Sequence, residues 1–283
     1  MKFFRTNIVK SLATLALATA GGGAFAASTW DLLALCSADT TTLQVFSCSG
    51  NGSGTTTNLV SANAYSTGTG TSAAPTTGTT FAAAAIYEYG SGLGVVATNE
   101  NSATTGPHAT DNQYGSDGIV FRFGAAVNLN ALAIGWNGTD DTTVPYTDSD
   151  VAVLAWTGSG TPTVAGANQA LTGWTLVGNL KNVGASNGTA AGGSASFLST
   201  VYSSYWLVSA YNTAYGGGTT GDSNVDAFKL LSVAGNLCSA TGGVVNNQCG
   251  STSTKIPEPG SLALLGLGLV GLVASRRRKQ PSV

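Results

Sequence analysis

The sequence predicts an all-β protein whose ectodomain, residues 27–250, is an antiparallel β-sandwich of jelly-roll type. Short runs rich in β-branched and aromatic residues recur between residues 84 and 233, each bounded by Gly, Asn, Asp, Thr or Pro. This pattern is typical of strands joined by turns. No segment of this region has sustained helical periodicity, which disfavours a parallel sheet with helical crossovers. Many short strands with polar turns pack naturally as antiparallel sheets.

Residues 1–26 have the order of a secretory signal peptide. Three basic residues and no acid occur among the first ten, an apolar run follows at 12–20, and Ala24-Phe25-Ala26 forms an A-x-A signature. We expect cleavage between Ala26 and Ala27. The apolar run is far below the roughly 20 residues of a spanning helix, which disfavours a retained N-terminal anchor.

The charge of the region between the two termini excludes one class of partner. Residues 27–255 contain twelve acidic and four basic residues, a net charge of 4 − 12 = −8. A domain this acidic repels phosphate backbones, so we expect no nucleic-acid binding. Charged residues make up 8% of the chain, against roughly 25% in ordinary globular domains. Such a surface, solvated by hydroxyls and amides, favours an extracellular β-protein.

Four cysteines lie in two short-range pairs near the two ends of the predicted domain. In an oxidising compartment an even count predicts disulfides, and four cysteines allow three connectivities. We favour Cys36 with Cys48 and Cys238 with Cys249, because short loops cost least entropy to close. A zinc site is the alternative, but no spacing is C-x₂-C and His108 is far from all four cysteines.

The elements of the domain follow in order along the chain. Residues 50–80 are rich in Gly, Ser and Thr and predict a long loop or weak edge strands. In the run 118–123 apolar residues alternate, whereas the run 205–211 has no polar face and is expected to be buried on both sides. The predicted strands are 84–89, 118–123, 129–136, 151–156, 174–180, 205–211 and 227–233.

The C-terminal segment combines a proline motif, an apolar tract and a cationic end. Pro257, Glu258 and Pro259 end a linker at 251–259, and the tract 262–274 follows. As a helix, residues 260–274 span roughly 22 Å, short of a hydrocarbon core of about 30 Å. Basic flanks stay cytoplasmic, so the folded domain is expected outside. The cationic residues are Arg276, Arg277, Arg278 and Lys279.

This three-part tail, residues 260–283 with the preceding proline pair, resembles the PEP-CTERM sorting signal. The resemblance implies recognition by a membrane-embedded exosortase, removal of the tail, and release or transfer to the cell surface. The alternative is a single-pass anchor that is never cut, which the short tract disfavours.

A second resemblance covers roughly residues 85–235. The segments 108–124 (HATDNQYGSDGIVFRFG), 132–136, 148–154 and 226–230 resemble a family of exosortase-dependent surface proteins. These segments are strand and turn patterns, so the resemblance implies a fold and a location and no catalytic residues.

Candidate catalytic motifs are weak. His108, the only histidine, lies three residues before Asp111 in a Gly- and Pro-flanked stretch. Residues 184–188 match G-x-S-x-G, but the strand and helix of a nucleophile elbow are missing. The G-x-G-x-x-G match at 266–271 lies in the apolar tract, where glycines favour close helix packing. We therefore expect no enzyme.

Acidic residues are the candidate metal ligands. Calcium takes six to eight oxygen ligands, and clustered Asp side chains provide them. The alternative is that these residues make turns and cap loops. The calcium candidates are Asp140, Asp141, Asp148 and Asp150, and further acids near turns are Asp111, Asp117, Asp222 and Asp226.

Aromatic residues are the candidate sugar contacts, since their rings stack on the apolar faces of sugars. Tyr211 and Tyr215, beside the glycine loop 216–218, are expected to be an exposed pair. Four tryptophans fall on predicted strands, where core packing is the commoner role. They are Trp136, Trp156, Trp174 and Trp206.

The sequence predicts an exported, non-enzymatic protein of the cell surface or extracellular matrix. Its expected partners are an exosortase-like enzyme, the inner membrane before processing, and exopolysaccharide. A secreted carbohydrate-binding module or adhesin, with or without calcium, is the alternative function. A hydrolase using paired aspartates is the third and would need two carboxylates about 5–10 Å apart across a cleft.

Overall fold

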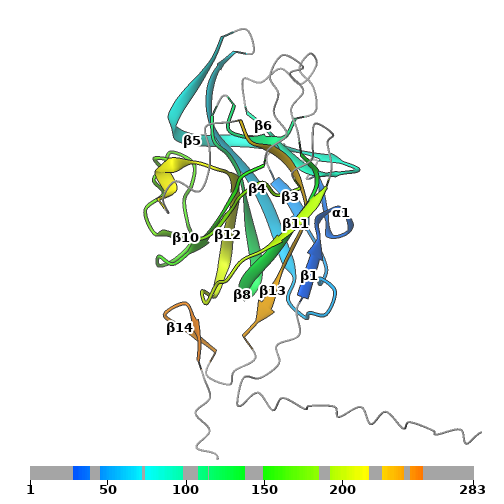
Figure 1. The fold of residues 1–283 in the computed structure, drawn as a ribbon. Coiled ribbons are helices and arrows are strands. Elements are labelled where there is room, and N and C mark those ends of the chain that lie inside the picture. Colours follow the sequence, from blue (N-terminus) through cyan, green and yellow to red (C-terminus); the bar gives the residue numbers. More distant parts are fainter. Residues whose placement is uncertain are drawn as a thin grey trace, which may run out of the picture.

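The computed structural model describes residues 28–38, 45–71, 74–97, 108–113, 115–137, 149–184, 192–216, 225–238 and 243–250. In these residues strands predominate and helix is nearly absent (Figure 1). The helical elements are α1 (Leu32–Leu35) and the 3₁₀ turn η1 (Thr213–Tyr215). The strands are β1 (Ser28–Asp31), β2 (Cys36–Ala38), β3 (Val45–Cys48), β4 (Leu59–Thr71), β5 (Ala74–Tyr89), β6 (Gly92–Val96), β7 (Thr110–Asp111), β8 (Asp117–Asn137), β9 (Val151–Trp156), β10 (Trp174–Leu180), β11 (Gly193–Ser196), β12 (Ser203–Ala210), β13 (Ala227–Leu237), β14 (Val244–Val245) and β15 (Gln248–Cys249).

One antiparallel sheet carries the fold and closes on itself. Its strand order is β10-β9-β12-β8-β13-β6-β5-β4-β3-β2, and β4 also pairs with β8. The additional pair makes β8, β13, β6, β5 and β4 a closed five-strand barrel unit. β12, β9 and β10 extend the sheet from β8, and β3 and β2 extend it from β4. The predicted all-β, antiparallel class is confirmed, while closure through β4 and β8 is an addition to the predicted sandwich.

β8 is the strand that joins the parts of the sheet. Its first half pairs with β12 on one side and β4 on the other, and its second half pairs with β13 and β11. The sequence predicted two strands here, 118–123 and 129–136. They form one continuous strand because residues 124–126 stay extended between them.

The Gly-, Ser- and Thr-rich segment 50–80 corrects a prediction. It was expected to be a loop or weak edge strands, but β4 lies inside the sheet, between β3 and β5 and against β8. Small side chains are suited to this position. Ala62 and Ala64 are almost fully buried, opposite Phe121 and Ile119 of β8. The small residues of β4 therefore make room for large ones on the neighbouring strand.

The remaining predicted strands are confirmed. β9 and β10 have the predicted bounds, and the runs 84–89, 205–211 and 227–233 correspond to β5, β12 and β13. Every residue of β12 is buried or half-buried, as expected for a run without a polar face.

Two apolar clusters pack on opposite faces of β9, β12 and β8. The larger contains Trp206, Phe121 and Val153 together with Trp30 of β1, whose ring meets Phe123 edge-on at 4.9 Å. The smaller contains Leu154, Leu207 and Val120 of these same three strands. It is covered by Phe81 of β5 and by Val164 and Leu171 of the connection between β9 and β10.

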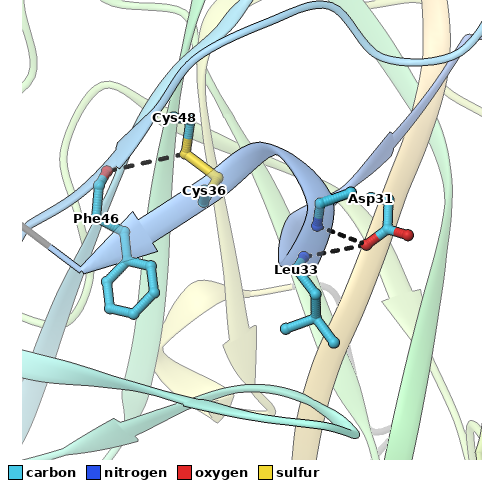
Figure 2. The surroundings of a disulfide bond; sticks show 6 residues. Asp31, Leu33, Cys36, Phe46 and Cys48 are labelled. Atoms are coloured by element: carbon cyan, nitrogen blue, oxygen red, sulfur yellow. Dashed lines mark hydrogen bonds between the residues drawn. A yellow bond between two sulfur atoms is a disulfide. The ribbon is translucent and has the colours of Figure 1, made fainter.

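Both predicted disulfides are confirmed, Cys36 with Cys48 and Cys238 with Cys249. Cys36 and Cys48 are register partners on β2 and β3, and both are buried (Figure 2). In the same view the carboxylate of Asp31 caps α1, since it accepts hydrogen bonds from the backbone nitrogens of Leu33 and Ala34. These contacts fix the start of the domain beside its first disulfide.

A separate two-stranded hairpin, β14 and β15, ends the described chain. Its turn residue Asn247 joins it to the main sheet. The backbone oxygen of Asn247 accepts from the nitrogen of Tyr202 at 2.7 Å, and its side-chain amide donates to the oxygens of Tyr202 (3.0 Å) and Trp156 (3.4 Å). The hairpin is therefore held at the end of β9 and the start of β12.

Within the part of the chain that the structure covers, no helix has the length and apolar character needed to cross a membrane. The signal-peptide residues Ala26 and Ala27 and the whole tail from residue 251 lie outside the described residues.

Candidate functional site

The acidic residues Asp150 and Asp226 meet at the ends of β9 and β13. Asp226 accepts hydrogen bonds from the backbone nitrogen of Asp150 and from the side-chain amide of Asn112, both at 2.7 Å. The backbone nitrogen of Asp226 donates to Asn112 Oδ1 at 2.9 Å. Asp150 in turn accepts from the backbone nitrogen of Asn182 through Oδ1 at 2.8 Å, and its backbone oxygen accepts from Tyr211. Both aspartates are about 1% exposed.

A second pair of acids lies at the same end of the sheet. Asp117, at the start of β8, is buried and accepts from the backbone nitrogen of Asp111 at 3.4 Å. Asp111 accepts from the backbone nitrogen of Gln113 at 2.9 Å. In all four residues the carboxylate receives backbone N–H groups at a strand end or turn, which is the chemistry of loop capping.

The predicted calcium ligands are only partly placed. Asp150 is in the network above, whereas Asp140, Asp141, Asp148 and Asp222 lie outside the described residues. Among the residues that are described, no group of three or more His, Cys, Asp or Glu side chains is arranged to hold a metal ion. Calcium binding at this loop stays a prediction.

The expectation of an exposed tyrosine pair is wrong for Tyr211. Only 6% of Tyr211 is exposed, so its ring has no free face on which a sugar stacks. Tyr215 is half-buried, but its hydroxyl is enclosed and lies 3.0 Å from Ser209 Oγ. Burial of the hydroxyl raises the pKa of Tyr215, the nearby charge of Asp117 raises it further, and the hydrogen bond with Ser209 lowers it. Tyr211, through its backbone bond to Asp150, and Tyr215, through its hydroxyl, stabilise the turn that follows β12.

His108 belongs to the interior of the fold. It is 4% exposed, and its ring centroid lies 5.6 Å from that of Tyr87 in a tilted arrangement. Gly94 of β6 packs on its backbone, since a Cβ on Gly94 would lie 2.1 Å from the His108 oxygen. Of the G-x-S-x-G match, Gly184 is described and residues 185–188 are outside the described part.

The predicted strand tryptophans differ in position. Trp206 is fully buried, as expected of a core residue, but Trp136, Trp156 and Trp174 are only half-buried. Sequence reasoning missed Lys229, which is 4% exposed with its ammonium 3.8 Å from the centroid of the Tyr89 ring and 4.8 Å from that of Trp136. A lysine within an otherwise apolar strand was the available signal.

Comparison with known protein families identifies the tail. Residues 255–279 match the PEP-CTERM protein-sorting motif. The predicted sorting residues, Pro257 to Pro259 and Arg276 to Arg278, fall within this match, so the predicted recognition is confirmed. The motif implies an exported, membrane-anchored precursor that an exosortase processes. A comparison with curated protein sequences finds no match.

Proposed function

We propose that this chain, which carries a PEP-CTERM sorting motif, is a non-enzymatic protein of the cell surface or extracellular matrix that associates with exopolysaccharide. The observation that carries the proposal is the sorting motif at residues 255–279, which follows a disulfide-bonded antiparallel domain. Disulfides persist in oxidising compartments outside the cytoplasm. The N-terminal signal at residues 1–26 provides the entry into the export route.

The sequence of the tail favours a membrane anchor that is later removed. The four cations at residues 276–279 hold its end in the cytoplasm, and the tract before them is shorter than the hydrocarbon core. Glycines within the tract allow close approach to a helical partner, here the processing enzyme. Cleavage at the proline motif then frees the domain from its anchor.

A non-enzymatic role fits the chemistry of the described residues. The buried carboxylates of Asp150 and Asp226 accept backbone N–H groups that end strands, and the imidazole of His108 is enclosed beside Tyr87. The hydrogen bonds of the two carboxylates join strand ends, which supports a structural role for these acids. The sheet thereby provides a stable scaffold for a binding surface.

The test is the intact mass of the protein recovered from the producing cells. We expect the mass of a chain that begins at Ala27 and ends near residues 257–260. The matched variants replace Arg276, Arg277 and Arg278 by Gln in one protein and Lys255 by Gln in the other. The first should retain the tail and stay with the membrane fraction, whereas the second should be processed like the natural chain. A mature mass that still includes Val283, or normal processing of the triple variant, contradicts the proposal.

A further inference from the structure

A row of aromatic side chains crosses one face of the sheet and ends on an arginine. Trp174 of β10 and Trp156 of β9 are register partners, and Tyr205 of β12 is the register partner of Arg122 of β8. Trp206 pairs with Ala155, so the same antiparallel register sets Tyr205 opposite Trp156. Register partners point to the same face of a sheet, and neighbouring strands lie about 4.8 Å apart.

This row is the open margin of the smaller apolar cluster. Each of its members lies two residues along its strand from a cluster residue, and residues two apart share a face. Leu154, Leu207 and Val120 are buried under Phe81 and the connection between β9 and β10, and the half-buried Leu176 packs against them. The row lies at the margin of this cover, because Gly160 and Thr161 of the same connection form hydrogen bonds with Trp156 and Tyr205, and Trp174 packs against the cluster. Trp174, Trp156 and Tyr205 are half-buried, and Arg122 is exposed.

The rings of the row are held in place before any ligand arrives. The indole nitrogen of Trp156 donates to the oxygen of Gly160 at 2.8 Å, and the Tyr205 hydroxyl lies 3.4 Å from Thr161 Oγ1. The centroids of the Trp156 and Trp174 rings are 5.6 Å apart. Side chains fixed in this way lose little entropy when a ligand packs on them.

The charge of the row is positive in an acidic domain. Arg122 is the only arginine between residues 6 and 275, and no carboxylate of the described residues forms an ion pair with it. The buried acids lie toward the other end of the same strands. Asp117 is five residues before Arg122 and Asp150 is six before Trp156, which correspond to roughly 16 and 20 Å along a strand.

We propose that this row binds a linear saccharide chain that contains acidic sugars. The C–H faces of successive sugar rings would pack on Trp174, Trp156 and Tyr205, as apolar rings with polar edges favour. The guanidinium of Arg122 would take a sugar carboxylate, which it matches in planar geometry and charge. This inference deepens the proposed function, because it names the ligand class and the face that would associate with exopolysaccharide.

The experiment measures binding of the exported full chain, purified in mild detergent, by affinity electrophoresis in gels that contain one polymer. The acidic probes are polygalacturonate, alginate and hyaluronate, and dextran is the neutral probe. We expect at least one acidic probe to retard the natural chain more than dextran does. Trp156→Ala and Arg122→Gln should each weaken that binding about tenfold. Arg122→Gln should also remove most of its dependence on ionic strength.

Matched controls separate this site from general effects. Tyr87→Ala removes an aromatic residue that is 43% exposed elsewhere on the sheet, and Lys181→Gln removes an exposed cation outside the row. Both should bind like the natural chain. Arg122 is exposed, so Arg122→Gln tests the site without removing core packing. The inference can therefore be tested even if Trp156→Ala fails to fold. Equal binding by Arg122→Gln and the natural chain, equal binding to dextran, or no binding to any acidic probe overturns the inference. Each of these results leaves the mass measurement of tail processing unaffected, so the two proposals fail separately.

Discussion

Asp226 accepts a hydrogen bond from the backbone nitrogen of Asp150 at 2.7 Å, which ties the start of β13 to the start of β9. These strands are not neighbours in the sheet, since β12 and β8 lie between them. The contact therefore holds together the end of the sheet across two intervening strands. Asn112 adds a third segment to the same carboxylate.

Replacement of Asp226 by Ala should destabilise the domain by about 3 kcal/mol, because it leaves the buried N–H of Asp150 without its acceptor and removes one of the two acceptors of the Asn112 amide. Asp226→Asn should cost less, since its amide oxygen still accepts one of these bonds. Urea unfolding followed by far-UV circular dichroism measures both changes. Equal stability of Asp226→Ala and the natural chain would show that the network contributes nothing.

The two disulfides should contribute differently to global stability. Replacing Cys36 and Cys48 by Ala should lower the free energy of unfolding by about 2–4 kcal/mol, because this bridge joins buried register partners. Replacing Cys238 and Cys249 should cost less, since their bridge closes the separate hairpin, which can open locally before the sheet does. Denaturant unfolding of the two double variants compares them, and equal losses would contradict this distinction.

The alkaline stability of the domain should depend on Tyr215. Burial raises its pKa above the ordinary value of 10.0 for a tyrosine, so the folded state retains the phenol proton more tightly than the unfolded chain. The corresponding stability is fully present below about pH 10 and is lost as the pH rises above it. Tyr215→Phe should reduce this alkaline loss. Part of the alkaline loss should remain in this variant, because burial also raises the pKa values of Tyr65 and Tyr202. The urea midpoint, followed from about pH 8 to pH 11, gives the difference between the two proteins.

A side chain at Gly173 should cost more than one at Gly160. Its φ is +85°, and a Cβ there would lie 2.5 Å from the Trp156 ring, whereas Gly160 has φ +71° and no neighbour within 4 Å of its Cβ. Gly160→Ala should therefore cost about 1 kcal/mol from backbone strain alone. Gly173→Ala should cost about 2 kcal/mol more and shift the tryptophan fluorescence, because the Trp156 ring must move. Thermal unfolding and emission spectra of the two variants distinguish strain from collision, and matching effects would place the Trp156 ring away from Gly173.

Sequence patterns predicted the parts of this fold that are local. The bounds of β9 and β10 were predictable because each is an apolar run between turn residues, and the disulfides because each closes a short loop. β4 was not, since its Ala, Ser, Thr and Gly residues have little strand signal of their own. Its place is determined by non-local pairing, such as Ala62 with Phe121. A strand whose partners are distant in sequence is specified by those partners.

The candidate sites divide in the same way. The sorting tail was predictable because its three parts are contiguous in sequence. The aromatic row was not, because it depends on the register of four strands and on which face the connection after β9 covers. Tyr211 was assigned wrongly for a related reason. A neighbouring glycine loop suggested exposure, but the residue immediately follows a strand buried on both sides.

The contacts of Asn247 determine at which end of the sheet the described chain ends. The described chain ends at Gly250, three residues after Asn247, which contacts the backbone of Trp156 and Tyr202. The nine residues 251–259 reach at most about 30 Å. If the row binds saccharide as proposed, a precursor whose tail is still embedded would hold this part of the domain within about 30 Å of linker from the lipid surface. Removal of the tail would then release the domain from the membrane surface, so processing would determine when the proposed ligand can bind.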